Sequence, residues 1–330
     1  MQNFCTLFNS AYLSRGLAMY RSLERVARDF HLYIFAFDDQ CADVLQRLQL
    51  KHATIISLKE FEDGDLLKAK ADRTAGEYCW TCTSSTIWYC IHTYSLDHCT
   101  YVDADLLFFS DPEVLTDELG ENSVLITEHR YSPEHDQSDL SGIYCVQFVT
   151  FRSTAAGLRA LEWWKNACID WCYKRFEEGK FGDQKYLDDW TTRFEGVHVL
   201  KNIGGGVAPW NNTKYSITAR EGKVFVKEIA TLHEEELVFY HFHDFRYGDR
   251  EVFRLTAERY LLSASLISTV YRHYLAMLRA SETEIKRIAP NVTFHEPLLR
   301  LDWITTNLGR KLTFLLKGYY KNYYKKKLLL

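Results

Sequence analysis

The stretch that decides the fold is residues 100–112, which read T-Y-V-D-A-D-L-L-F-F-S-D-P. An apolar strand ends here in two aspartates, Asp103 and Asp105, with one residue between them. In an open α/β sheet, ligands bind outside the carboxyl ends of the strands. If the chain turns as it leaves the strand, both carboxylates can face one hard divalent cation, and the cation keeps open positions for the oxygens of a diphosphate. A solvated turn is the alternative for an isolated D-x-D, but the apolar strand and the aromatic residues that flank it favour a metal site.

The amino-terminal half alternates short β-rich runs with helical patterns, which is typical of crossover units around a mostly parallel sheet. From residue 251 to the end the pattern is helical, so we place a soft domain boundary near residue 250, between a domain of residues 1–250 and a helical region of residues 251–330. The fold class is therefore α/β. Strands are predicted at 4–8, 32–37, 54–58, 101–103, 124–127 and 144–151, and helices at 12–28, 41–50, 81–92, 155–176 and 182–190.

Length and composition indicate an ordinary globular protein with a large core, since 47% of the 330 residues are apolar and 25% are charged. The net charge is −4, but the last 23 residues carry seven Lys or Arg and no Asp or Glu. A basic tail on an acidic body argues against nucleic-acid binding, which needs a basic face. The sequence shows neither a signal-peptide pattern nor a run of about 18 apolar residues, so we expect a cytoplasmic protein.

The nine cysteines are an odd number for a disulfide framework, and a chain of this size does not need disulfides to fold. We therefore expect reduced thiols in the core. The alternative is a four-thiolate zinc site made by the pair Cys79 and Cys82 with the pair Cys168 and Cys172. Both pairs lie among aromatic residues in helix-like segments, where cysteine behaves as a small hydrophobic residue, so core packing is favoured.

Four further segments accompany the D-x-D in a fixed order. They are T-L-F-N-S-A-Y-L-S-R-G-L at 6–17, F-G-D-Q-K-Y-L at 181–187, G-G-G-V-A-P-W-N at 204–211 and L-V-F-Y-H-F-H-D-F at 237–245. Over roughly residues 1–250 the chain resembles the GT-A glycosyltransferases, especially glycogenin and the bacterial galactosyltransferases and glucosyltransferases of lipopolysaccharide synthesis. The resemblance implies a Rossmann-like nucleotide-diphospho-sugar transferase fold with a mostly parallel central sheet and a helical C-terminal extension.

The same resemblance implies a function. The chain is expected to be a metal-dependent hexosyltransferase that moves a sugar from a nucleotide-sugar donor, a UDP-sugar by expectation, to a saccharide or lipid-linked saccharide acceptor. Transfer is expected to retain the anomeric configuration. Lipopolysaccharide or capsule biosynthesis is the setting that the family suggests, and no nucleic-acid partner is expected.

Site residues carry over by matching position. The metal ligands are expected to be Asp103, Asp105 and His241, and since imidazole suits Mn²⁺ better than Mg²⁺, manganese is favoured. Asp183 is expected to bind donor-sugar hydroxyls, and the amide of Gln184 to stabilise positive charge at the anomeric carbon. A helix N-terminus with acidic residues is the alternative explanation of this D-Q pair. Donor contacts are expected from Phe8, Asn9, Tyr12, Arg73, Asp103, Ala104 and Gly205, with Trp210 as a further candidate in the glycine-rich loop.

The chain also departs from the family. After Phe242 the family's glycine, lysine and P-W are replaced by His243, Asp244 and Phe245, so Arg246 or Arg250 would have to take the place of the pyrophosphate-binding lysine, and His243 is a second candidate metal ligand. A donor-binding module without turnover fits the missing P-W. A sugar nucleotidyltransferase is the rival enzyme class, but it would need a glycine-rich phosphate loop bearing Lys or Arg after the first strand, which residues 6–17 lack.

The carboxyl-terminal segment mixes Lys with Tyr and Leu: residues 311–330 read K-L-T-F-L-L-K-G-Y-Y-K-N-Y-Y-K-K-K-L-L-L. Interfacial membrane segments have this composition, and each basic residue near an anionic leaflet contributes about 1 kcal/mol. We therefore predict peripheral association with the anionic inner face of a membrane, which would suit a lipid-linked acceptor. A solvated Lys-rich helix end is the alternative.

Overall fold

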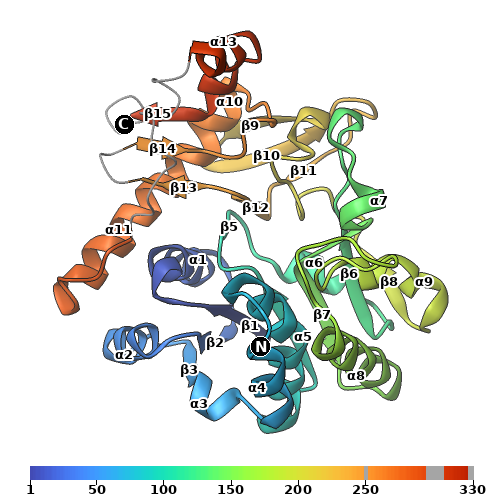
Figure 1. The fold of residues 1–330 in the computed structure, drawn as a ribbon. Coiled ribbons are helices and arrows are strands. Elements are labelled where there is room, and N and C mark those ends of the chain that lie inside the picture. Colours follow the sequence, from blue (N-terminus) through green and yellow to red (C-terminus); the bar gives the residue numbers. More distant parts are fainter. Residues whose placement is uncertain (249–251, 295–307, 326–330) are drawn as a thin grey trace.

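The computed structural model describes residues 1–248, 252–294 and 308–325. A seven-stranded sheet in the order β3-β2-β1-β4-β7-β6-β8 forms its centre (Figure 1). Neighbouring strands from β3 to β4 are parallel, as are β6 and β8, whereas β7 is antiparallel to both of its neighbours. The predicted α/β fold with a mostly parallel sheet is therefore confirmed. The strands of this sheet are β1 (Gln2–Phe8), β2 (Phe30–Ala36), β3 (Ala53–Ser57), β4 (His98–Val102), β6 (Val124–Glu128), β7 (Tyr144–Arg152) and β8 (Val197–Val199).

Helices cover both faces of this sheet because its strands are apolar on both sides. In β1, Phe4 and Phe8 face one hydrophobic cluster with α1, α2 and α11, whereas Cys5 and Leu7 face a second cluster with α5 and α8. The helices of residues 1–200 are η1 (Ser10–Tyr12), α1 (Leu13–Val26), α2 (Asp39–Leu48), α3 (Leu58–Phe61), α4 (Gly64–Lys70), α5 (Ala75–Thr93), α6 (Glu113–Asp117), η2 (Pro133–His135), α7 (Ser138–Ser141), α8 (Ala155–Asp170), η3 (Lys185–Asp189) and α9 (Trp190–Arg193).

Helix α8 is shorter than the pattern predicts. It ends at Asp170 rather than near residue 176, because Trp171 takes an extended conformation with φ −150°. The guanidinium of Arg73 donates a hydrogen bond of 3.1 Å to the carbonyl of Ile169, which satisfies one of the carbonyls left free at the helix end. A contact from residue 73 thus helps to end the helix, and the local aromatic pattern gives no sign of it.

Past the central sheet, short strands build a second layer over the ends of β4 and β7 (Figure 1). Strand β5 (Leu106–Phe108) directly follows the D-x-D and pairs with β12 (Phe239–His241). An antiparallel sheet of β9 (Tyr215–Arg220), β10 (Lys223–Glu228) and β11 (Glu234–Glu236) follows η4 (Asn212–Lys214). This arrangement brings residues 237–243 against the turn that carries the two aspartates.

The carboxyl-terminal region is helical, as predicted, in α10 (Ala264–Leu266), η6 (Ile267–Tyr271), α11 (Arg272–Ile288), α13 (Leu308–Leu316) and η7 (Tyr319–Asn322). The prediction of helix throughout was wrong, because β14 (Val252–Arg254) pairs with both β13 (Arg246–Tyr247) and β15 (Tyr323–Lys325). Strands of two or three residues are too short to show a local periodicity, and the partner of β14 in β15 is far away in sequence, since Phe253 pairs with Tyr324. The division of the chain near residue 250 stays a prediction, and residues 249–251, 295–307 and 326–330 lie outside the described residues.

Within the described part of the chain, no helix is both long and apolar enough to cross a bilayer.

Candidate active site

The two aspartates of the D-x-D meet His241 at the carboxyl end of β4. His241 Nε2 lies 3.2 Å from Asp105 Oδ1 and 3.9 Å from Asp103 Oδ2. One ligand atom from each of the three side chains lies within 4.8 Å of the other two. We call these residues the Asp-Asp-His group. Two carboxylates and an imidazole so arranged can hold one divalent cation.

Backbone hydrogen bonds fix all three members of the group. The N–H of Asp103 donates to the carbonyl of Gln147 in β7 at 3.1 Å, and the carbonyl of Asp105 accepts from the N–H of Phe242 at 3.0 Å. The N–H of His241 donates to the carbonyl of Val207 at 3.0 Å. Four segments distant in sequence, at residues 103–105, 147, 207 and 241–242, are therefore held together by main-chain hydrogen bonds, so the backbone fixes where the three side chains start.

Charge is unevenly distributed within the group. Burial, with repulsion from Asp105, raises the pKa of Asp103 to about 6, although His241 opposes this. Burial also disfavours the charged form of Asp105, but the adjacent His241 outweighs it and lowers the pKa of Asp105 to about 2. Attraction to Asp105 likewise overcomes burial and raises the pKa of His241 well above its usual value. Without a cation, His241 thus acts as the positive partner of Asp105.

Two residues that the sequence analysis did not single out contact members of the Asp-Asp-His group. Gln147 Oε1 lies 2.7 Å from His241 Nδ1, and the hydroxyl of Tyr101 hydrogen-bonds the carboxylate of Asp103. Gln147 is fully buried, and it interrupts the apolar run of β7. A buried amide needs hydrogen-bond partners, so one glutamine in such a strand is a signal that sequence reasoning could have used.

Trp210, a candidate from the glycine-rich loop, packs beside the group. Its ring lies 5.2 Å from that of His241 and 5.3 Å from that of His243, edge-to-face in both pairs. Its indole N–H donates to the carbonyl of His129 at 2.9 Å, which fixes the ring. His243 lies next to the group but is not one of the three side chains whose ligand atoms converge, so the geometry favours His241 as the ligand.

Asp183 lies near Asp103, and the side chain of Gln184 is held in place next to it, while their roles in donor binding stay predictions. Burial, reinforced by Asp103, raises the pKa of Asp183 to about 7 even though Thr83 hydrogen-bonds its carboxylate. Asp183 therefore lies close enough to Asp103 for the two charges to interact. The side-chain amide of Gln184 donates to the carbonyl of Ser141 at 2.6 Å. Thr83, on α5, is a further site residue that the sequence analysis missed.

The side chains after β1 that are expected to contact the donor are only partly exposed. Phe8 is buried against Gly16, where an added Cβ would lie 2.3 Å from the Phe8 ring, while Asn9 and Tyr12 are half-buried. The guanidinium of Arg15 lies 4.3 Å from the Tyr12 ring centroid and donates to the carbonyl of Phe245 at 3.2 Å. Arg15 thus ties this loop to the segment that follows His243.

Arg73 and Gly205, two further residues expected to contact the donor, have structural roles. The Arg73 side chain packs on the ring of Tyr173, 4.0 Å from its centroid, in addition to its bond to Ile169. An added Cβ at Gly205 would lie 2.9 Å from Leu115 and from Leu200, so this glycine permits close core packing. Their contacts with a donor stay predictions, as does that of the buried Ala104.

Arg246 and Arg250 are the two candidates for the cation that would bind the pyrophosphate. Arg246 Nε lies 3.1 Å from Asp244 Oδ1, whereas Arg250 lies outside the described residues. The choice between them stays open.

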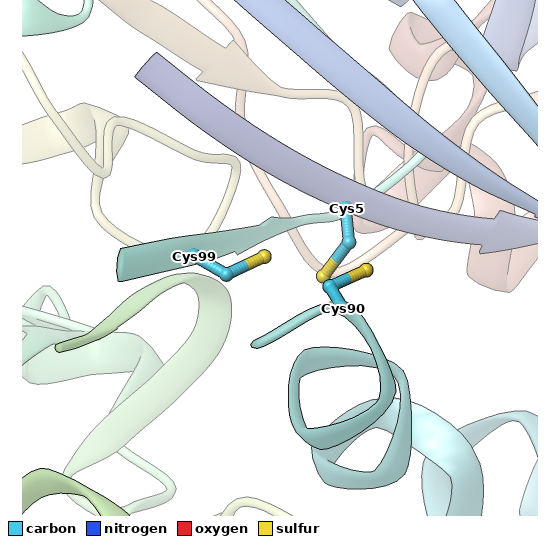
Figure 2. Close-up of side chains that lie close together, drawn as sticks. All are labelled: Cys5, Cys90 and Cys99. Carbon is cyan, nitrogen blue, oxygen red and sulfur yellow. The ribbon is translucent and has the colours of Figure 1, made fainter. Parts of the chain in front are cut away.

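A second set of potential metal ligands lies inside the core. Cys5 of β1, Cys99 of β4 and Cys90 of α5 meet between sheet and helix with their sulfur atoms within 4.8 Å of one another (Figure 2). All three are fully buried, and burial raises the pKa of Cys90 and Cys99 well above the usual thiol value. At Cys5 burial is outweighed by hydrogen bonds from these two thiols, which lower its pKa to about 5, so at most one of the three would ionise. A thiolate site would therefore bury uncompensated negative charge, and neutral packing is the better explanation.

All nine cysteines are free thiols, which agrees with the expectation of reduced core residues. Among the described residues, the four cysteines of the alternative zinc site do not form a group of converging ligands.

Comparison with known proteins places this site in context. No family model matches the chain. The Bacillus subtilis strain 168 protein YfnD, itself uncharacterised, is 31% identical over 293 residues, which cover 88% of this chain and 92% of YfnD. The uncharacterised protein YfnF of the same strain is 32% identical over 251 residues, which cover 74% of this chain and 81% of YfnF.

Among solved structures, the galactosyltransferase LgtC in complex with donor and acceptor sugar analogues has a similar fold. Its TM-score is 0.54 at 10% sequence identity, over 84% of this chain and 96% of that chain. At this identity the likeness concerns the fold, and it confirms the expected GT-A architecture.

Proposed function

Since this chain belongs to the same family as YfnD and YfnF and has the GT-A fold, we propose that it is a metal-dependent glycosyltransferase. In this proposal it transfers a sugar from a nucleotide-diphospho-sugar, a UDP-sugar by preference, to a saccharide or lipid-linked saccharide. The observation that carries the proposal is the convergence of Asp103, Asp105 and His241 at the carboxyl end of β4, beside Asp183. Crevices at this end of α/β sheets are where nucleotides bind.

The chemistry of the Asp-Asp-His group fits a divalent metal. Three protein ligands leave coordination positions free, and two carboxylates with one imidazole suit Mn²⁺ better than Mg²⁺. Burial and repulsion from Asp105 raise the pKa of Asp103, so its ionised form is disfavoured without a cation and would be stabilised by a bound one. When bound, Mn²⁺ would neutralise charge that develops on the departing nucleoside diphosphate.

The chain's own residues would bind and orient the sugar. The carboxyl of Asp183 accepts hydrogen bonds from sugar hydroxyls, and with a pKa raised to about 7 by burial it donates one when protonated. The hydrogen bond of Gln184 to Ser141 holds its amide in place, so that the amide oxygen can face developing positive charge at the anomeric carbon. Phe8, Asn9 and Tyr12 would contact the nucleoside.

Retention of configuration is part of the proposal, because the family resemblance implies attack from the leaving-group side. NMR of the first product before mutarotation tests this directly. A product with the inverted anomer would exclude the retaining mechanism and leave the transferase assignment standing.

The experiment that tests the function measures nucleoside diphosphate release from UDP-, GDP- and ADP-sugars with Mn²⁺ or EDTA. Wild type is compared with Asp103→Ala and with Asp65→Asn, which changes an exposed aspartate on α4. We expect release from one donor that requires Mn²⁺, is lost in Asp103→Ala and is unchanged in Asp65→Asn. Donor binding without release, with or without added saccharides, would favour the binding-module alternative, and nucleotide exchange with inorganic pyrophosphate would favour a nucleotidyltransferase.

We propose in addition that α13 contacts an anionic membrane surface. Three of its leucines are largely exposed, at 60% for Leu312, 72% for Leu315 and 77% for Leu316, and exposed lysines Lys311 and Lys317 flank them. Apolar side chains bordered by cations are the pattern of interfacial helices. Lys321 and Lys325 follow further along the tail, and the last two lysines, at 326–327, lie outside the described residues. A cytoplasmic location also stays a prediction.

A further inference from the structure

We propose that Gln147 is a positioning residue that sets the tautomer of His241 and holds Asp103 in register with it. This inference rests on the proposed metal centre, although its first readout does not require metal. Gln147 lies in β7, whereas Asp103 and Asp105 lie in the turn between β4 and β5 and His241 lies at the end of β12. It lies outside the set of residues that the family resemblance points to.

The first observation is the burial of Gln147. Its exposed fraction is 0%, and its neighbours in the strand, Val146 and Phe148, are buried apolar residues. Placing an amide in such surroundings without hydrogen bonds costs about 1–3 kcal/mol. An apolar residue would suit the strand better, so the polarity of residue 147 is explained by what it contacts.

The second observation is the contact with His241. Gln147 Oε1 lies 2.7 Å from Nδ1 of His241, and a carbonyl oxygen can only accept a hydrogen bond. Nδ1 must therefore carry the proton. In the neutral imidazole the lone pair is then on Nε2, the nitrogen that faces Asp105 at 3.2 Å and Asp103 at 3.9 Å. Gln147 thus directs the lone pair of His241 to the point where the carboxylates converge.

The third observation concerns the main chain. The carbonyl of Gln147 accepts the N–H of Asp103 at 3.1 Å, directly after the last pair of the β4–β7 ladder, Val102 with Phe148. One residue therefore contacts two metal ligands that are 138 positions apart in sequence, Asp103 by its backbone and His241 by its side chain. Only the side-chain contact depends on the identity of residue 147, which makes it testable by substitution.

The fourth observation allows the positioning role to be separated from a stabilising one. Among the described residues, Gln147 Nε2 has no hydrogen-bond partner. Gln147→Leu removes this unsatisfied donor along with the useful acceptor, so the loss of stability is partly offset. Gln147→Glu keeps an acceptor in place for Nδ1. Thr150→Val is the matched control. Thr150 lies on β7, like Gln147, and the substitution breaks its buried 2.8 Å hydrogen bond to Thr100 on β4 without touching His241.

The experiment has two readouts on the full chain, each with thermal unfolding as a check of the fold. Long-range ¹H–¹⁵N spectra of the metal-free protein, recorded at alkaline pH where the imidazole of His241 is neutral, report which nitrogen of His241 carries the proton, with His241→Gln to assign the signals. Titration with Mn²⁺ alone, followed by electron paramagnetic resonance, reports affinity. We expect an Nδ1–H tautomer and an Mn²⁺ dissociation constant raised about 10–100-fold in Gln147→Leu. Gln147→Glu should bind Mn²⁺ at least as tightly as wild type, because it keeps the acceptor for Nδ1 and adds negative charge, and Thr150→Val should stay within a few-fold of wild type.

Some outcomes overturn the inference while leaving the proposed function intact. These are wild-type Mn²⁺ affinity in Gln147→Leu, an unprotonated Nδ1 in the wild type, or equal losses in Gln147→Glu and Gln147→Leu. If the wild type binds no Mn²⁺, the proposed metal centre fails, and the tautomer of His241 in wild type and Gln147→Leu still decides whether Gln147 sets it.

Discussion

Gly206 is the position where one added methyl group should be felt most at the metal site. Its φ is +93°, and an added Cβ would lie 2.9 Å from Thr127 Cγ2 and 3.3 Å from Gln147 Nε2. A side chain at positive φ costs about 1–2 kcal/mol, and overpacking a close-packed interior costs about 1–3 kcal/mol more. Gly206→Ala should therefore lower the free energy of unfolding by about 2–5 kcal/mol and weaken Mn²⁺ binding, because Gln147 must move.

Two matched variants separate the backbone cost from the steric cost. Gly222 lies in the hairpin between β9 and β10 with φ +76° and no atom within 4 Å of an added Cβ, so Gly222→Ala should show only the cost of positive φ. Thr127→Ser removes Cγ2 but keeps the hydroxyl that donates to the carbonyl of Phe148 at 3.0 Å. In the Gly206→Ala background it should recover about 1–3 kcal/mol.

Urea unfolding of the wild type, the three single variants and the double variant gives these free energies. Equal losses in Gly206→Ala and Gly222→Ala, or no coupling between Gly206→Ala and Thr127→Ser, would refute the steric argument.

Three further predictions follow from the site and its supports. Asp105→Ala should lower kcat for donor turnover by at least about 10³-fold, since the metal contributes several kcal/mol to the transition state, while circular dichroism stays that of the wild type; a fully active variant would exclude the metal site. Hydrogen bonds from the N–H groups of Lys174 and Thr74 lower the pKa of Glu77 from 4.5 to about 2. The ionised Glu77 therefore stabilises the fold fully above pH 4.5, and this stabilisation is lost as the pH falls toward 2. The free energy of unfolding of wild type should exceed that of Glu77→Gln by about 1 kcal/mol at neutral pH, after allowance for solvent screening. Unfolding measured as a function of pH should show this difference vanish between pH 4.5 and 2. Leu315→Glu should reduce sedimentation with vesicles that contain anionic lipid, and sedimentation equal to that of wild type would contradict the membrane proposal.

The sequence predicted those parts of the fold and site that leave local signals. Strand and helix periodicities located the central sheet, because its strands are continuous apolar runs between amphipathic helices. The D-x-D was visible because two carboxylates directly follow such a run, and the structure brings Asp103 and Asp105 together with His241. Each of these residues lies where an apolar strand ends, and this pattern can be seen in the sequence.

Other features could not be predicted, since they depend on contacts between distant segments. Arg73 was predicted to contact the donor, and the structure adds that its guanidinium packs on Tyr173 and helps to end α8. Gly205 was also predicted to contact the donor, and the structure adds that its missing side chain makes room for Leu115 and Leu200. Both donor contacts stay predictions. A basic residue or a glycine has several physical uses, and only the neighbours supplied by tertiary structure decide among them.

Gln147 shows how a physical rule can recover part of what periodicity misses. A run such as that of β7 predicts a buried strand, and a buried amide within it predicts a partner, because an unpaired amide would destabilise the fold. The rule identifies residue 147 without naming the partner. The partner follows only from the pairing of β4 with β7 and from the placement of β12, which bring Asp103 to the backbone of residue 147 and His241 to its side chain. A polar residue in the middle of an apolar strand, like a carboxylate at a strand end, therefore indicates a buried contact that the sequence alone does not identify.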